Sequence, residues 1–169
     1  VQKKLNKKEI LYWLKKSSSE AFEHFELTKE ERERVAHNHD LASGPHVPLY
    51  AGVKEALHYF DINVLVTHKK REETMDTLRY HNLEDLFHEV VCIRSDGFKD
   101  KPHVSAYQYV LHKYPIDIVI GDRALDLIPG KKLGLKTCAF QNPDIEADMH
   151  LDTYIKLNRN WFRARMQKI

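Results

Sequence analysis

The chain has 169 residues, of which 31% are charged, and its formal net charge is +2 at pH 7. This length allows one good-sized domain, or one domain with a small appendage. So small a net charge does not favour a nucleic-acid-binding protein, and no apolar run is long enough to cross a bilayer. Cys92 and Cys138 each lie inside an apolar run and are expected to be reduced core thiols of a cytoplasmic protein.

The first forty-odd residues carry helical patterns and no strand pattern. Thr28 and Glu31 have the Thr-x-x-Glu spacing of a capping box, which predicts that a helix begins there. The Gly/Pro-rich stretch Ser43–Pro48 is the predicted boundary between this helical start and the rest of the chain. The sequence therefore divides into a helical segment at 1–47, an α/β core at 48–157 and a basic C-terminal tail at 158–169, which is either a flexible terminus or a docking helix.

Beyond the boundary, short apolar runs alternate with segments of helical periodicity. The predicted strands are Ile62–Val66, Glu89–Ile93, Ile116–Ile120 and Lys136–Phe140. This alternation indicates βαβ units and a parallel sheet with helices on both faces. Because crossovers between parallel strands are right-handed, the predicted fold class is α/β with a doubly wound, Rossmann-type parallel sheet.

Polar residues follow each of the first three predicted strands, where ligands of an open parallel sheet bind. Thr67 and His68 follow the first strand, Lys101 follows the second, and Asp122 and Asp126 follow the third. A hydroxyl group and a helix N-terminus can donate hydrogen bonds to phosphate oxygens. A lysine offsets their charge, and carboxylates hold Mg²⁺. The sequence therefore predicts a site for a phosphate group and Mg²⁺ at this edge.

These residues, in this order, resemble the motifs of the haloacid dehalogenase (HAD) superfamily. "VLVTH" resembles its second motif, "KDKPHVSAY" its third in the Lys-Pro form of phosphoglycolate-phosphatase-like members, and "IVIGDRALDLIPGKKLGLKTCAF" its fourth. The resemblance runs from about Leu49 to Leu157, and the helical start is similar to part of the small helical cap of such proteins. It implies a Mg²⁺-dependent phosphohydrolase that cleaves a small phosphate monoester through an aspartyl-phosphate.

The same resemblance implies roles for the residues at the strand ends. Thr67 and Lys101 would be the catalytic residues that bind phosphate, and His68 a further phosphate contact. Asp122 would be a direct metal ligand, and Asp126 would support it through water or through Lys101.

The nucleophile motif of the superfamily, Asp-x-Asp-Gly-Thr, is not present in the sequence. Asp117 lies within a predicted strand, and Asp96 precedes a glycine that no threonine follows. The resemblance places the strand that carries this motif in the middle of the sheet, between Ile62–Val66 and Ile116–Ile120. Without it, two apolar strand edges would be left unpaired. We therefore expect that the sequence begins within the cap of a longer protein, and that the chain as it stands has no phosphatase turnover.

Two other functions are compatible with the sequence. One is a catalytically silent protein of the same fold that binds a phosphorylated ligand or a protein partner. The other is nucleic-acid binding through the basic tail Asn158–Ile169, which predicts salt-sensitive affinity. The substrate and the oligomeric state are not fixed by the sequence.

Simpler interpretations exist for several residues. Asp122 and Asp126 could be a charge pair that complements the dipole of the following helix. Arg123, by contrast, could have a functional role as a contact for a substrate anion. A cluster of metal-ligand types is better interpreted as a solvated loop than as a metal site; it consists of His37, His39, Asp40 and His46.

Overall fold

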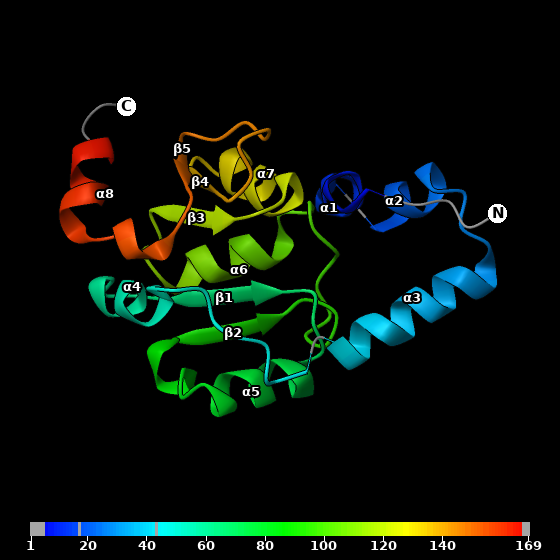
Figure 1. The fold of residues 1–169 in the computed structure, drawn as a ribbon. Coiled ribbons are helices and arrows are strands. Elements are labelled where there is room, and N and C mark those ends of the chain that lie inside the picture. Colours follow the sequence, from blue (N-terminus) through cyan, green and yellow to red (C-terminus); the bar gives the residue numbers. More distant parts are fainter. Residues whose placement is uncertain (1–5, 17, 43, 167–169) are drawn as a thin grey trace. The chain divides into compact units, whose positions relative to one another are not determined.

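A computed structural model describes residues 6–16, 18–42 and 44–166 of the chain (Figure 1). The chain divides into two compact units, Val1–Gly44 and Pro45–Ile169. None of the helices within the described ranges is long and apolar enough to span a membrane.

The first unit is helical and contains α1 (Lys7–Lys16), α2 (Ser18–His24) and α3 (Lys29–Ala42). The ring of Trp13 on α1 stacks on that of His24 on α2, with 4.1 Å between the ring centroids. The predicted capping box is confirmed at the start of α3. There the Thr28 backbone N–H donates to Glu31 Oε2 at 2.9 Å, and the Glu31 N–H donates to Thr28 Oγ1 at 3.3 Å. Ser43 and the side chains of His37, His39 and Asp40 lie outside the described residues.

The second unit contains five strands in two parallel sheets. In one sheet β1 (Val64–Thr67) pairs with β2 (Glu89–Cys92), and in the other β4 (Lys136–Phe140) lies between β3 (Ile118–Gly121) and β5 (Met149–Leu151). The parallel pairing confirms the predicted α/β class. The short strand β5 was not predicted, because three residues with an exposed histidine in the middle give no apolar run.

Helices cover both faces of the strands. They are α4 (Val53–Tyr59), α5 (Arg71–Tyr80), α6 (Ser105–Lys113), α7 (Ala124–Lys132) and α8 (Arg159–Met166), with short 3₁₀ turns η1 (Glu84–Leu86) and η2 (Tyr154–Lys156). On β3, Ile118 and Ile120 pack in an apolar cluster with Ala56 of α4, whereas Val119 packs in a second cluster with Val110 of α6. Because successive side chains of a strand point to opposite faces, α4 and α6 lie on opposite sides of β3.

Most of the basic C-terminal tail is the helix α8, and it docks on the core. Trp161 and Phe162 are partly buried against the cluster that contains Leu157. The rings of Phe60 and Phe162 meet edge to face, with 5.6 Å between their centroids. Of the two forms expected for this segment, the docking helix is the one observed.

The two sheets are separated between β1 and β3, and no strand of the described residues pairs with both. Every residue of β1 and β3 is only partly buried, whereas four of the five residues of β4 are fully buried. A cavity of about 760 Å³, here called the central cleft, is lined by residues of both β1 and β3. This is where the sequence predicts unpaired apolar strand edges.

Candidate active site

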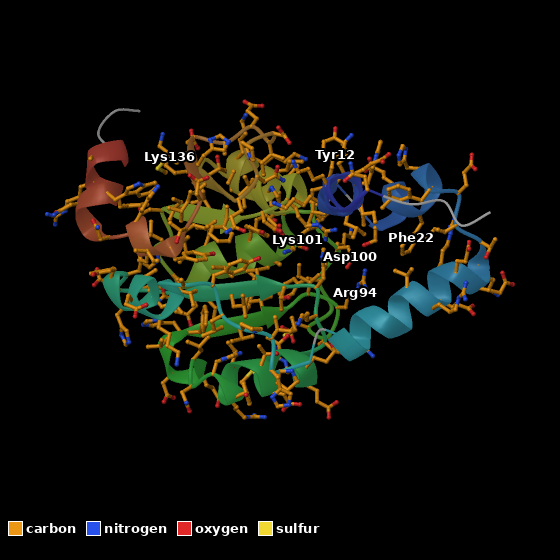
Figure 2. All side chains as sticks on the ribbon, in the orientation of Figure 1. Tyr12, Phe22, Arg94, Asp100, Lys101 and Lys136 are labelled. Atoms are coloured by element: carbon orange, nitrogen blue, oxygen red, sulfur yellow. The ribbon has the colours of Figure 1, made fainter. Side chains whose placement is uncertain are left out.

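Lys101 lies at the carboxyl ends of the strands, in the loop between β2 and α6, together with Asp100 and Arg94 (Figure 2). Its Nζ atom is 2.6 Å from Asp126 Oδ1 and donates a second hydrogen bond to the carbonyl oxygen of Val66 at 3.2 Å. The side chains of Lys101 and Asp126 are only 7% and 14% exposed. One ammonium group therefore joins the end of β1 to the segment that follows β3.

Asp126 reaches Lys101 because of how the chain turns after β3. A Cβ atom on Gly121 would lie 2.5 Å from the Cβ of Asp126, so only glycine allows this close approach. Asp126 lies in the first turn of α7, where the helix dipole favours a negative charge. The Tyr107 hydroxyl donates to the Asp126 carbonyl oxygen at 2.9 Å, and burial raises the pKa of Tyr107, so that it remains a donor. The close approach to Gly121 and the hydrogen bond from Tyr107 of α6 thus fix the position of Asp126.

His68 fixes the backbone of the lysine loop. Its Nε2 atom accepts a hydrogen bond from the Lys101 backbone N–H at 3.0 Å and lies 3.6 Å from Asp100 Oδ1. Burial, followed by the positive charge of Lys101, lowers the pKa of His68. The accepting role of Nε2 assigns the proton of the neutral ring to Nδ1. Only the Nδ1–H group then remains to donate to a ligand, so the predicted phosphate contact of His68 stays a prediction.

Thr67 and Asp122 lie at the ends of their strands. Thr67 is the last residue of β1, and its Oγ1 accepts the Lys69 backbone N–H at 3.1 Å, which leaves its own O–H to donate. Asp122 follows β3 directly and precedes α7, rather than sharing the first helical turn with Asp126. Its carbonyl oxygen accepts a 2.7 Å hydrogen bond from Asn142 Nδ2.

Asn142 was missed by sequence reasoning. It is only 7% exposed and holds the loop that carries Asp122. A signal was available, because Asn142 follows the apolar run Lys136–Phe140 closely, as the other polar residues follow their strands.

Asp126, which contacts the lysine, and Asp122, which follows β3, are the predicted ligands of a hard cation. Among the side chains that the structure describes, which do not include those of His37, His39 and Asp40, no three from His, Cys, Asp or Glu form a metal cluster. Mg²⁺ does not require one, since it keeps several waters and is commonly bound through one or two carboxylates together with substrate phosphates. Asp126 uses Oδ1 for Lys101. Asp122 and Asp126 are carboxylates of the kind that Mg²⁺ prefers, and their role as metal ligands stays a prediction.

Comparison with known proteins is consistent with this arrangement. A family model for haloacid dehalogenase-like hydrolases matches residues 1–140. The chain belongs to that family. This confirms the resemblance found in the motifs around Thr67, Lys101 and Asp122.

Several solved structures share the fold. A hydrolase from Streptococcus pneumoniae is 29% identical, with a TM-score of 0.60 over 82% of this chain and 76% of that one. A predicted phosphoglycolate phosphatase from Haemophilus somnus is 19% identical, with a TM-score of 0.65 over 89% and 80%. A HAD-hydrolase from Bacillus subtilis bound to magnesium is 24% identical, with a TM-score of 0.52 over 62% and 49%. No curated protein gives a significant sequence match.

The hydrogen bond between His68 and the Lys101 backbone should depend on pH. Because the pKa of His68 in the folded chain lies below 6.5, the contribution of the neutral ring to stability is fully present above pH 6.5. It is lost as the pH falls through the folded-state pKa, when Nε2 becomes protonated and can no longer accept. In ¹⁵N-resolved NMR, the Lys101 amide resonance should therefore titrate with a midpoint below 6.5, and His68→Phe should abolish that titration. A midpoint at or above 6.5 would contradict the prediction.

Proposed function

We propose that this chain carries the phosphate- and metal-binding residues of a Mg²⁺-dependent phosphohydrolase that acts on a small phosphate monoester. The observation that carries the proposal is the buried Lys101–Asp126 pair at 2.6 Å, at the strand edge where Thr67 and Asp122 also lie. A buried ammonium group paired with one carboxylate, at a strand edge that also carries a hydroxyl and a second carboxylate, suits a ligand that brings negative oxygens together with a divalent cation. The magnesium-bound relative and the phosphatase relative support the same proposal.

Each residue has a distinct task in this reaction. The Thr67 hydroxyl donates to one phosphate oxygen, and the Lys101 ammonium offsets the negative charge of the phosphoryl group. Asp126 holds Lys101 in place, and His68 fixes its backbone. Mg²⁺ bound by Asp122 and Asp126 would supply further charge stabilisation as the phosphoryl group is transferred.

The chemical step requires a carboxylate nucleophile. That carboxylate attacks phosphorus, the ester oxygen leaves, and water then hydrolyses the aspartyl-phosphate. Because the 169 residues contain no Asp-x-Asp-Gly-Thr motif, we expect this chain to bind phosphate without turning an ester over.

Binding of inorganic phosphate, followed by calorimetry with and without Mg²⁺, tests the proposal. We expect phosphate binding that requires Mg²⁺, and no release of phosphate from a generic phosphate ester. Loss of the hydroxyl in Thr67→Val should weaken phosphate binding roughly tenfold, the effect of one hydrogen bond to a charged group. Asp122→Asn should remove the Mg²⁺ dependence, whereas Asp76→Asn, at an exposed carboxylate on α5, should change nothing. Phosphate binding that is the same with and without Mg²⁺, and the same in Thr67→Val, would refute the proposed site. Robust turnover of a phosphate ester would refute the expected inactivity.

A catalytically silent HAD protein is the second candidate, because the buried Lys101–Asp126 pair suits binding of a phosphorylated ligand whether or not a nucleophile is present. It would bind a phosphorylated ligand or a protein partner at the same edge. Reading the coding DNA upstream of Val1 separates the two candidates. An apolar strand ending in Asp-x-Asp-Gly-Thr supports the phosphohydrolase, whereas a strand that ends without the aspartate supports the silent protein.

A further inference from the structure

The loop that carries Lys101 also carries a carboxylate, which is an unexpected neighbour for a phosphate site. Asp100 directly precedes Lys101, and its Oδ1 atom lies 3.6 Å from His68 Nε2. The same Nε2 atom accepts the Lys101 backbone N–H at 3.0 Å. A negative charge at this position repels an incoming phosphate group. The charge of Asp100 must therefore be offset if the loop is to bind phosphate.

Arg94 supplies this offset (Figure 2). Its Nε atom donates to Asp100 Oδ1 at 3.0 Å, and its Nη2 atom donates to Asp100 Oδ2 at 2.9 Å. The hydrogen bonds from Arg94 lower the pKa of Asp100, so the carboxylate is ionised at neutral pH. A two-point contact between a planar guanidinium and a carboxylate fixes the direction of the carboxylate as well as offsetting its charge.

The backbone that carries Arg94 is itself fixed, by the turn that follows β2. The Asp96 carboxylate accepts the Cys92 backbone N–H at 2.9 Å. Across the same turn, the Phe98 N–H donates to the Ile93 carbonyl oxygen at 2.8 Å. Arg94 lies inside this hydrogen-bonded turn, so its guanidinium holds the carboxylate from a defined anchor point.

His68 is the group that an unpaired Asp100 would disturb. Burial lowers the pKa of His68 most, followed by the charge of Lys101, and Arg94 lowers it further. Asp100 and Asp126 raise it. A protonated Nε2 atom would donate to Asp100 and could no longer accept the Lys101 backbone N–H. The pairing of Asp100 with Arg94 therefore favours the neutral ring, and with it the observed backbone of Lys101.

We propose that Arg94 is a positioning residue of the phosphate site, which holds Asp100 so that this carboxylate neither takes the Nε2 atom of His68 nor repels the phosphate. The inference rests on the proposed function, because it concerns the same site. Arg94 acts through Asp100 and not through a contact of its own with phosphate. The side chains of Arg94 and Asp100 are 68% and 51% exposed, so solvent screens the pair and its effect on affinity is modest.

A double-variant cycle in the full chain tests the proposal, with inorganic phosphate and saturating Mg²⁺ in calorimetry. Arg94→Met should weaken phosphate binding roughly fivefold, the upper range for an exposed ion pair. Asp100→Asn should bind phosphate at least as tightly as the unchanged chain, because it removes a negative charge. The double variant should regain the affinity of the unchanged chain. Arg79→Met, at an exposed arginine of α5 that pairs with Asp76 and Glu84, is the matched control and should change nothing.

Two outcomes of this cycle would overturn the positioning role. If Arg94 bound phosphate directly, the double variant would be as weak as Arg94→Met, because restoring neutrality would not restore a lost contact. If Arg94→Met bound phosphate as tightly as the Arg79→Met control, the charge of Asp100 would not need an offset.

A second measurement needs no phosphate. The ring resonances of His68, followed by NMR against pH, should show a higher titration midpoint in Arg94→Met and a lower one in Asp100→Asn. The double variant should return the midpoint towards that of the unchanged chain. An unchanged midpoint in Arg94→Met would overturn the proposal. If the unchanged chain binds no phosphate with Mg²⁺, the proposed function fails, whereas the His68 titration still decides whether Arg94 positions Asp100.

Discussion

Replacing Lys101 with methionine should lower the free energy of unfolding by about 3 kcal/mol at pH 7, since removing one partner of a buried ion pair leaves the other charge uncompensated. The Lys101 and Asp126 side chains are 7% and 14% exposed, so solvent screens this pair weakly. The variant also loses the donor to the Val66 carbonyl oxygen. Urea denaturation measures the change, and Lys99→Met, at an exposed lysine in the same loop, is the matched control.

A double-variant cycle tests whether the loss comes from the ion pair. Asp126→Asn in the Lys101→Met background removes the stranded charge, so the double variant should be more stable than the sum of the two single losses predicts. If Lys101→Met is no less stable than Lys99→Met, the buried pair does not contribute as proposed.

Replacing Gly52 with alanine should cost about 3 kcal/mol or more, because the backbone itself would have to shift. Gly52 has a φ of +83°, and an added Cβ atom would lie 2.5 Å from the backbone nitrogen of Ile155. This close approach seats the start of α4 against η2, and residues of both elements line the central cleft.

Gly134→Ala is the matched control for the conformational part of this cost. Gly134 has nearly the same φ, +77°, but no atom lies within 4 Å of its added Cβ. It should therefore show only the strain of a left-handed alanine, about 1 kcal/mol. Equal losses in the two variants, measured by urea denaturation, would mean that α4 moves away from η2 without resistance.

Much of the α/β unit could be predicted because its signals are local. The apolar run Lys136–Phe140 became β4 with the predicted bounds, whereas Ile116–Ile120 became a strand at Ile118–Gly121. The bounds differ because an apolar run indicates which residues are buried, whereas a strand begins only where a neighbouring strand supplies backbone hydrogen bonds. β5 depends almost entirely on its pairing with β4, so its three residues carry little signal of their own.

The candidate site shows the same limit. The polar residues after each strand could be named from their positions, but their contacts could not. That His68 binds the backbone of Lys101, and that Asn142 holds the carbonyl of Asp122, depends on loops that meet only in the folded chain. A contact between residues that are distant in the sequence produces no periodic sequence pattern from which it could be predicted.

The division of the sheet into two parts bears on how the α/β unit unfolds. No ladder of backbone hydrogen bonds joins β1 to β3. One apolar cluster lies on the β3–β5 side, whereas the other contains residues of both parts. The links across the division are made by side chains. They include the packing of α6 on Val66 and Val119, the bonds of Lys101 to both sides, and the bond of the Tyr107 hydroxyl to the Asp126 carbonyl oxygen. Side-chain links are weaker carriers of cooperativity than a shared ladder, so the β1–β2 part and the β3–β5 part form separate candidates for independent opening. Within the α/β unit, the coupling between the two groups of strands therefore depends on α6 and on the contacts of Lys101 and Tyr107.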